Sequence, residues 1–425
     1  MGLKIESTRV AVTTGAGPQT IDITGFGTPK LAFFYWVRAA SGTEFTTDAN
    51  ICIGYTDGTT QRCWNAAVQD GQTTADTRRM SSTDRVGILK NFADNTVDSE
   101  IGFNSWSSNG VVLDIDDAPP SGYYVIVELW GGTDIDWVDC GHQDDLGTTA
   151  TSTNITAGGG DQADLVFMVQ SMFSTPPASP FDDNSNGLIS YGVWSRNDST
   201  QAMAVFAEIS GGSGGAPCNY FDGDKISAQQ IVGGGGAYLC TASAHASGFT
   251  ITTSAGAGSD VVGWVAIKWA TTPSIKIVTS TLPASAADWE ESGIGFQPEF
   301  AKFCFTAATV DGTRKESGDC EFMVGTIQAS QVLTCGIASE VNAGTSNVSQ
   351  WSQTSFFIGD PDAATTKVSG GLSSLDSDGF TVGISGTHDS VARLGWTLGI
   401  KAASTEAPYI TPLPQRNVRH SGRYF

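Results

Sequence analysis

Gly248-Phe249-Thr250-Ile251-Thr252 and, after a polar gap, Gly263-Trp264-Val265-Ala266-Ile267-Lys268-Trp269 are two short apolar segments in the middle of the chain. Segments rich in β-branched and aromatic residues, separated by turn formers, are typical of the two strands of a hairpin. The pattern recurs as Gly379-Phe380-Thr381-Val382-Gly383-Ile384 followed by Gly395-Trp396-Thr397-Leu398-Gly399-Ile400-Lys401, and a more divergent copy runs from Gly110 to Trp130. The chain is therefore predicted to contain a repeat that is built from strands.

Two other landmarks recur in the same order. Apolar strands are predicted to start at Leu31, Leu165 and Phe300, which lie 134 and 135 positions apart. Each is followed by a short apolar strand that contains a glycine, and these glycines are Gly54, Gly192 and Gly325. A single period of roughly 130 to 138 residues therefore accounts for the chain up to about residue 402.

The length of this period predicts the fold class. It exceeds the roughly 20 to 50 residues of solenoid and propeller repeats, so each copy is expected to be a domain with its own core. The charged fraction is 16%, below the usual value of about 25%, and 51 glycines favour a turn-rich all-β protein. We predict three tandem antiparallel β-sandwich domains, jelly-roll or Greek-key-like, over residues 1–133, 134–272 and 273–402, followed by an extended basic C-terminal arm over 403–425.

The repeated aromatic residues are expected to form the core of each sandwich. Phe249 is predicted to pack against Trp264, and Phe380 against Trp396, because aromatic side chains in apolar strands are usually buried. Short linkers between the copies suggest that the sandwiches touch. We expect either a monomer that is pseudo-trimeric within one chain or a homo-oligomer.

Charge and composition exclude several classes of partner. The net charge is −22 and the pI is about 4.3, which disfavours nucleic-acid binding because that requires clustered Lys and Arg. The first residues contain no apolar signal core, and no window approaches the roughly 18 apolar residues of a membrane span, so membrane insertion is not expected. Eight cysteines without a Cys-x-x-Cys pair favour buried free thiols, while Cys52 with Cys63 and Cys320 with Cys335 remain possible disulfides.

Catalytic and metal signals are weak. The four histidines are scattered along the chain and show no triad spacing, so the protein is not expected to be an enzyme. Residues 182–187 match the first half of a calcium loop, with Asp182, Asn184 and Asn186 as candidate ligands. The twelfth position of this loop is Val193 rather than Glu, so a turn is preferred over a calcium site, and no other cofactor is expected.

Aromatic residues in polar surroundings are the candidates for ligand contact. Tryptophan faces stack on sugar rings, and four tryptophans lie in or beside polar, loop-like segments: Trp64, Trp106, Trp194 and Trp351. For each of them, packing at a domain edge is preferred over contact with a ligand. The arm carries basic and aromatic residues that could dock on an acidic partner, although a frayed tail is an equal alternative; they are Arg416, Arg419, Arg423, Tyr424 and Phe425.

Parts of the chain resemble known proteins. Gly295-Phe296-Gln297-Pro298 before an apolar strand, the strand near Gly325, and Ser377-Asp378-Gly379-Phe380-Thr381-Val382 resemble repeats in virion structural proteins of tailed bacteriophages. The resemblance covers all three copies and is best in the third. The segment from Gly248 to Ile267 also resembles the end of an H-type lectin domain, a sandwich that assembles as trimers and binds sugars.

The phage resemblance implies a non-enzymatic structural protein that is made in the host bacterial cytoplasm and joins other virion proteins on the particle. We expect a tail-associated component, in a tail fibre or tail tip, that takes part in host-surface attachment and contacts a host-surface glycan. A capsid decoration protein that stabilises the head, a glycan-active hydrolase and a free lectin are the alternatives. No heptad stalk is visible, which counts against a long trimeric fibre.

Overall fold

The computed structural model describes residues 2–403, except 46–47, 74–75, 145, 147–149, 172–180, 209, 211–216, 231–237, 255–260, 317–318, 330, 341–346, 362–364 and 386–387. Within these residues all regular structure is β-strand and no helix is present, so the predicted all-β class is confirmed. No helix that is long and apolar enough to cross a membrane occurs in this part of the chain. The strands fall into three successive groups, which we name the first, second and third repeat.

The first repeat contains β1 (Leu3–Ala11), β2 (Gly17–Asp22), β3 (Pro29–Val37), β4 (Thr43–Glu44), β5 (Ala49–Thr56), β6 (Gln61–Val68), β7 (Thr77–Ser82), β8 (Gly87–Asn91), β9 (Thr96–Trp106), β10 (Gly110–Asp117) and β11 (Tyr124–Gly132). The second contains β12 (Ile135–Gln143), β13 (Ser152–Thr156), β14 (Leu165–Gln170), β15 (Asp182–Ser185), β16 (Gly187–Ser195), β17 (Gln201–Glu208), β18 (Pro217–Asp222), β19 (Ser227–Gln230), β20 (Tyr238–His245), β21 (Gly248–Thr253) and β22 (Val262–Trp269). The third contains β23 (Ser274–Leu282), β24 (Trp289–Glu291), β25 (Phe300–Thr306), β26 (Cys320–Gln328), β27 (Gln331–Ser339), β28 (Val348–Gln353), β29 (Phe356–Asp360), β30 (Thr365–Asp376), β31 (Gly379–Ile384) and β32 (Arg393–Lys401).

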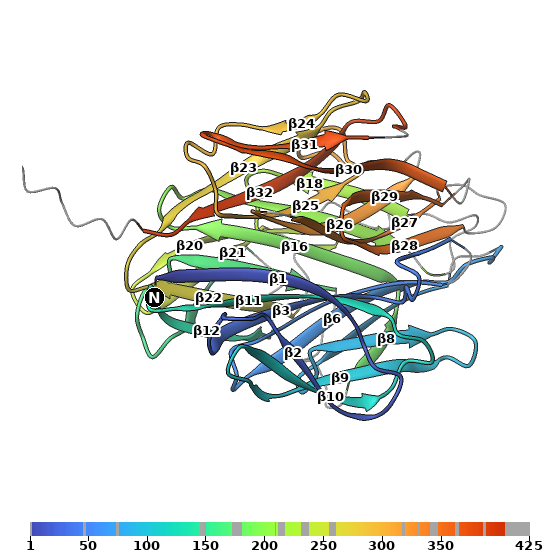
Figure 1. Ribbon diagram of the computed structural model, residues 1–425, viewed down its shortest axis with the longest axis horizontal. Helices are drawn as coiled ribbons and strands as arrows, with labels where there is room; N and C mark the ends of the chain where they lie inside the picture. Colours follow the sequence, from blue (N-terminus) through green and yellow to red (C-terminus); the bar gives the residue numbers. More distant parts are fainter. Residues whose placement is uncertain are drawn as a thin grey trace, which may run out of the picture.

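Strand order is the same in the three repeats. Figure 1 shows the labelled strands of the first repeat, in blue to teal, below those of the third repeat, in yellow to red. Each has a large sheet, whose shared order is β1-β11-β3-β5-β6-β7, β12-β22-β14-β16-β17-β18 and β23-β32-β25-β26-β27-β28. Each also has a four-stranded sheet, in the order β2-β10-β9-β8, β13-β21-β20-β19 and β24-β31-β30-β29. All strand pairs are antiparallel, so the chain is a tandem repeat of one topology. The division into domains at residues 133 and 272 stays a prediction.

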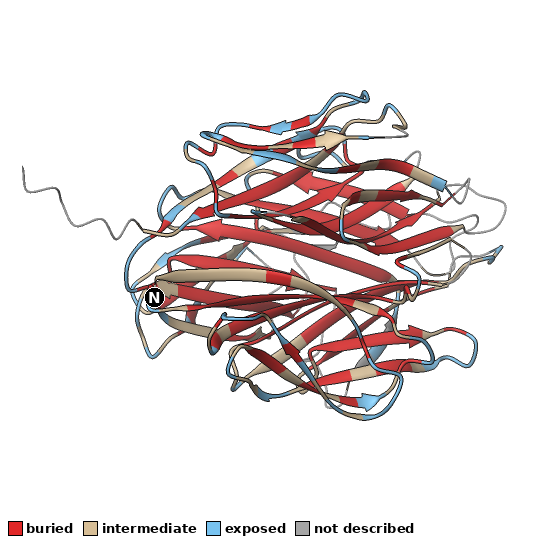
Figure 2. Ribbon diagram, viewed as in Figure 1, coloured by how far each residue is buried: buried red, intermediate tan, exposed pale blue. Residues whose placement is uncertain are grey.

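Apolar residues are buried on both faces of each large sheet. One face packs on the four-stranded sheet of the same repeat, as in the cluster that joins Phe34 of β3 to Leu113 of β10. The other face belongs to a single cluster shared by all three repeats, which includes Tyr35, Phe167 and Leu398. Figure 2 shows the inner strands of the large sheets as almost continuously buried, whereas the edge strand β1 is mostly intermediate. Because both faces are covered, their strands read as apolar runs rather than as alternating ones.

Three corresponding side chains meet in this shared cluster. Strand pairing places Phe33 opposite Glu128, Phe167 opposite Val265 and Lys302 opposite Leu398, so Phe33, Phe167 and Lys302 occupy the same place in their sheets. The rings of Phe33 and Phe167 are 5.1 Å apart between centroids. The Lys302 ammonium lies 3.7 Å from the Phe33 centroid and 4.4 Å from that of Phe167. The large sheets therefore converge on one point.

The repeats also extend one another's large sheets at the edge. Strand β15 of the second repeat pairs with β7 of the first, and β4 of the first pairs with β28 of the third. Lys315 of the third repeat forms a bridge to Asn219 in β18 of the second, with N···O distances of 2.9 and 3.1 Å. The strands β7, β18 and β28 hold the same place in their sheets. Each repeat thus covers an edge of a neighbour, and the three contacts close a ring, which we name the edge exchange.

The recurring glycine at the start of each hairpin has a steric cause. A Cβ atom on Gly110 would lie 2.0 Å from the Ile21 carbonyl oxygen, one on Gly248 2.1 Å from that of Ile155, and one on Gly379 1.8 Å from that of Glu291. The hairpin therefore starts directly against the backbone of the neighbouring strand in all three repeats. Only glycine allows this approach.

Of the two predicted aromatic pairs, the pair in the second repeat is confirmed and the pair in the third repeat is wrong. Phe249 does pack edge-on against Trp264, with 5.7 Å between ring centroids. Trp396, however, points into the shared cluster, and Phe380 packs instead against Trp289, at 5.0 Å. Strand pairing shows that Trp396 corresponds to Gly263 and not to Trp264. Aligning the two Gly-Trp pairs shifts the register by one residue, which exchanges the two faces of a strand.

Candidate functional site

Three of the four candidate glycan-contact tryptophans are buried, which corrects their expected position in loops. Trp64 lies in β6, Trp194 in β16 and Trp351 in β28, with 0%, 2% and 0% of their surface exposed. Trp106 at the end of β9 is half-buried and packs edge-on against Phe103, at 4.7 Å.

The polar residues beside these tryptophans are the reason for the wrong expectation. Asn65, next to Trp64, is fully buried and donates to Asn50. Trp64 itself stacks on Tyr55 at 5.6 Å, and the Tyr55 hydroxyl donates to Gly141 of the second repeat at 2.8 Å. The contacts between repeats bury polar groups that sequence patterns assign to loops. Of the four, only Trp106 retains a partly exposed ring.

Of the three calcium candidates, Asp182 and Asn184 lie in strand β15, and Asn186 lies between β15 and β16. Asp182 to Ser185 form β15 and pair with Ser81 to Arg78 of the first repeat. Asn186 has a positive φ of 68°, and its side-chain oxygen accepts a hydrogen bond from the Ser210 N–H at 2.8 Å. In the described part of the chain, no group of three His, Cys, Asp or Glu side chains could hold a metal ion. For this segment the structure shows backbone pairing at the edge of a sheet.

The other candidate residues divide into two groups. All eight cysteines are buried free thiols, so neither possible disulfide forms. The arm residues lie outside the described residues; they are Arg416, Arg419, Arg423, Tyr424 and Phe425.

A buried ion pair occupies the centre of the shared cluster. Lys302 Nζ lies 3.1 Å from Glu128 Oε1, and neither side chain is exposed. Glu128 also accepts hydrogen bonds from Trp130 Nε1 at 2.6 Å and from the Tyr35 hydroxyl at 3.2 Å. Tyr35 and Tyr191 place their hydroxyl oxygens 3.2 Å apart. The site therefore joins residues of all three repeats in one hydrogen-bonded network.

Burial changes the acidity of this network. It lowers the pKa of Lys302 to about 8, while the Glu128 charge acts in the opposite direction. It raises the pKa of the Tyr35 hydroxyl well above its ordinary value, and Glu128 and Tyr191 add to the effect. The two tyrosines therefore stay neutral near pH 7. Because all of these groups are buried, the network is suited to holding the repeats together.

The best surface candidate is a cavity of about 280 Å³ in the third repeat that is lined by charged side chains. Arg393 of β32 binds Glu321 of β26 through two nitrogens, with Nη2–Oε1 at 2.9 Å, and reaches Asp389 at 2.5 Å. Lys367 of β30 contacts Asp319 and lies 3.2 Å from Glu321 Oε1. With Lys315 at the rim, the lining carries three cations and three carboxylates.

The carboxylates of this cavity are poor candidates for a general acid. Burial alone would raise the pKa of Glu321, but Arg393 and Lys367 more than offset it and hold this pKa below its ordinary value. Arg393 likewise lowers the pKa of Asp389 against the effect of burial. A general acid in glycoside hydrolysis needs a raised pKa. The cavity is thus chemically suited to pairing charges or binding a polar group.

Carboxyl groups with raised pKa values lie elsewhere. Burial raises the pKa of Glu208 in the second repeat to about 8 and that of Glu291 in the third to about 7. Glu208 is fully buried and Glu291 is 7% exposed, and neither lines the charged cavity. They are placed to affect stability rather than to meet a substrate.

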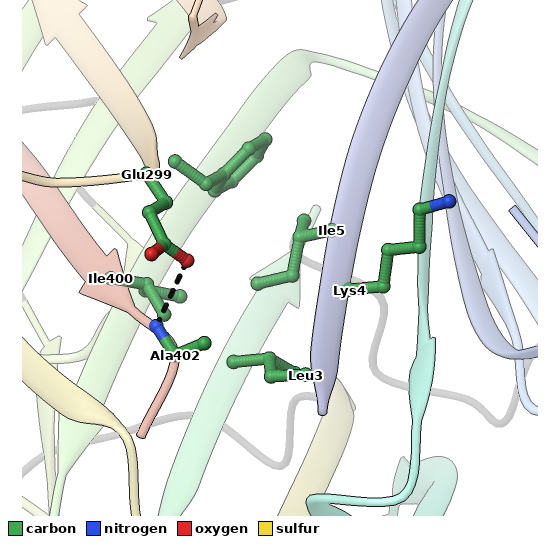
Figure 3. A pocket seen from close by; sticks show the side chains of 7 residues that line it. Leu3, Lys4, Ile5, Glu299, Ile400 and Ala402 are labelled. Carbon is green, nitrogen blue, oxygen red and sulfur yellow. Dashed lines mark hydrogen bonds between the residues drawn. The ribbon is translucent and has the colours of Figure 1, made fainter. Parts of the chain in front are cut away.

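A smaller cavity lies where the first and third repeats meet, near both ends of the described chain (Figure 3). Its volume is about 150 Å³, and its lining combines apolar residues with the charged residues Lys4 and Glu299. Figure 3 shows Leu3 and Ile5 facing Ile400 across the opening, while Lys4 points away from it. The Glu299 carboxylate accepts a hydrogen bond from the Ala402 N–H at 3.2 Å. We name this cavity the seam pocket.

No family model matches the sequence, and no curated protein matches it as a relative. The central pair and the charged cavity were missed by sequence reasoning. One signal could have indicated them, since Lys302, Glu128 and Glu321 each interrupt an apolar strand. Charged residues are almost never fully buried unless they are paired, so each predicts a buried partner.

Proposed function

We propose that the chain is a non-enzymatic structural protein of a tailed-phage virion, in which three β-sandwich domains form a pseudo-trimer within one chain. The observation that supports this most is the edge exchange. A sheet edge offers unpaired N–H and C=O groups, and here one edge of each large sheet contacts the next repeat. The ring of contacts between the three repeats produces a rigid unit, and rigidity suits a structural component of a virion. The phage assignment itself rests on the sequence resemblance.

Burial of aromatic residues affects the choice between roles on the particle. Attachment to a host glycan was expected to use four tryptophans, and only Trp106 remains partly exposed. A decoration protein that holds its neighbours in the head needs no exposed tryptophan. The structure therefore favours decoration over tail-associated attachment as the role of this block.

Gold labelling of virions with an antibody to the purified protein tests the proposal. Label on the head at hundreds of copies per particle is the result expected for decoration. Label confined to the tail, together with glycan binding that is lost in Trp106→Ala, would establish attachment instead. Absence of the protein from purified virions would refute both roles.

The pseudo-trimer has its own test, which is independent of location. Light scattering on the purified protein is expected to give the mass of one chain, 44.4 kDa. X-ray scattering is expected to show one compact particle. A profile of three separated bodies would contradict the closed arrangement, whatever the protein does on the virion.

A further inference from the structure

The residues around the seam pocket have counterparts in the other repeats, which hydrogen bonds identify. The Glu299 N–H donates to the Ile400 carbonyl at 2.9 Å, and the Asp164 N–H donates to that of Ile267 at 2.8 Å. Asp164 accepts from the Trp269 N–H at 2.9 Å, as Glu299 does from that of Ala402. Ala402 therefore corresponds to Trp269.

Indoles occupy this neighbourhood in the first and second repeats. Pairing with Leu31 and Phe300 shows that Trp130 of the first repeat corresponds to Ile400 of the third. Trp130 and Trp269 are buried and stack on each other at 6.4 Å. The third repeat has Ile400 and Ala402 instead, and the pocket opens beside them. The third repeat thus lacks the indole that the first and second repeats each have at one of these two places.

The first strand of each repeat shows the same difference. Ile135 and Pro273 stand at the places that correspond to Leu3 and are buried, whereas Leu3 is partly exposed. The contact between the third and first repeats is thus the incomplete one. The pocket has a volume of about 150 Å³ and is lined by Leu, Ile and Phe together with Glu299, so it has room for an aromatic ring that carries a polar group.

The chain itself carries aromatic residues just beyond this pocket. The described residues end at Ala403, one residue after Ala402 on the pocket wall, and 22 residues follow. Tyr409 is the first aromatic residue among them. Seven residues span up to roughly 23 Å when extended, which is ample for a return to the pocket. A short loop has a low closure entropy, and attachment gives an effective concentration on the order of millimolar.

We propose that the seam pocket binds the Tyr409 side chain of the same chain. The ring takes the place that Trp130 and Trp269 fill in the other repeats. The phenol hydroxyl donates to the Glu299 carboxylate at the edge of the pocket, which accounts for tyrosine at this position. Binding of Tyr409 holds the arm at the contact between the first and third repeats. The basic residues that follow Tyr409 then start from this contact.

Binding of p-cresol, the tyrosine side-chain analogue, tests the proposal on full-length chains. Tyr409→Ala is expected to bind p-cresol at least tenfold more tightly than the unaltered chain, because the pocket is vacated. Shifts of the Ile5 and Ile400 methyl NMR signals locate the binding. Tyr424→Ala is the matched control and is expected to behave like the unaltered chain.

Three outcomes would overturn the proposal. The unaltered chain and Tyr409→Ala could bind p-cresol equally, or Tyr409→Ala could fail to bind it. A dimer that dissociates on Tyr409→Ala substitution would assign the pocket to the arm of a second copy. The double variant Tyr409→Ala, Ala402→Trp serves as a check on the site, since its indole is expected to fill the pocket and abolish p-cresol binding.

Discussion

Lys302 Nζ lies 3.1 Å from Glu128 Oε1, and these two fully buried side chains join the third repeat to the first. Removing two charges from water is costly, and the attraction between them compensates only when further hydrogen bonds satisfy both groups. Here Trp130 and Tyr35 donate to Glu128, and the Phe33 and Phe167 rings face the ammonium. The pair is therefore well satisfied, and each partner depends on the other.

Removing one partner of this pair is expected to destabilise the protein strongly. Lys302→Met leaves the Glu128 charge buried without its cation and should lower the free energy of unfolding by about 3 to 5 kcal/mol. The double variant Lys302→Met, Glu128→Val places at position 128 the residue type of the second repeat, Val265. It should recover part of this loss, because no charge stays buried, while the Trp130 N–H loses its acceptor. Urea unfolding of the two single variants and the double variant measures the coupling. A loss in the double variant equal to the sum of the two single losses would show that the pair is not coupled.

The free energy of unfolding should fall as the pH rises, because of Glu208. Its pKa is raised to about 8 by burial, with the Ser339 hydroxyl acting against the shift. Between the ordinary pKa of 4.5 and about 8, the folded state holds a proton that the unfolded state has lost. The free energy of unfolding therefore declines over this window, by on the order of a few kcal/mol, and then levels off. Glu208→Gln keeps the shape without the titration, and its stability should decline less steeply; the remaining decline is due to Glu291, whose pKa is raised to about 7. An unchanged slope would contradict the assignment to Glu208.

The hairpin glycine should tolerate no side chain. A Cβ on Gly379 would lie 1.8 Å from the Glu291 carbonyl oxygen, whereas one on Gly371 would meet nothing within 4 Å. Gly379→Ala must displace backbone and is expected to cost several times as much stability as Gly371→Ala, which should be within about 1 kcal/mol of the unaltered protein. Thermal unfolding compares them directly. Similar melting temperatures for the two variants would contradict this expectation, because they would mean that β31 moves away from Glu291 at little cost.

Trp289 is expected to be the most costly aromatic residue to truncate in the third repeat. Its ring contacts Phe303, Phe305, Phe356 and Phe380 at centroid distances between 4.9 and 5.4 Å. Trp289→Ala should lower the free energy of unfolding by about 3 to 5 kcal/mol. Trp106→Ala, with a half-buried ring, should lower it by about 1 to 2 kcal/mol. Equal losses in chemical unfolding would argue against this view of the core.

Much of the architecture is visible in the sequence because it depends on local patterns. Apolar runs, turn formers and the glycines at 110, 248 and 379 recur with a steady period, and the structure shows the same strand order in each copy. Faces of strands are harder to assign, since one residue of misalignment placed Trp396 in the wrong cluster. The sequence does not reveal this error. Both faces of a central strand are apolar here, so the residue pattern fits either alignment.

The contacts between repeats could not be predicted for a different reason. They pair residues that are far apart in the chain, such as Gln350 with the Arg38 N–H at 3.0 Å. They also bury polar groups, so Trp64, Trp194 and Trp351 seemed to lie in loops. The segment 182–187 resembled a metal loop because Asp and Asn are common at both loops and exposed edges. The one signal in the sequence for the buried ion pair is the presence of charged residues within apolar strands.

The meeting of Phe33, Phe167 and Lys302 at one point has a consequence for how such a protein can change. In a trimer of identical chains, a lysine at this place would occur three times, and three ammonium groups would repel one another in a buried space. Because the three places belong to one chain, a single lysine can stand opposite a single glutamate while the other two places keep phenylalanine. Covalent connection thus releases the centre from the symmetry that identical subunits impose, and each outer face is free to diverge on its own.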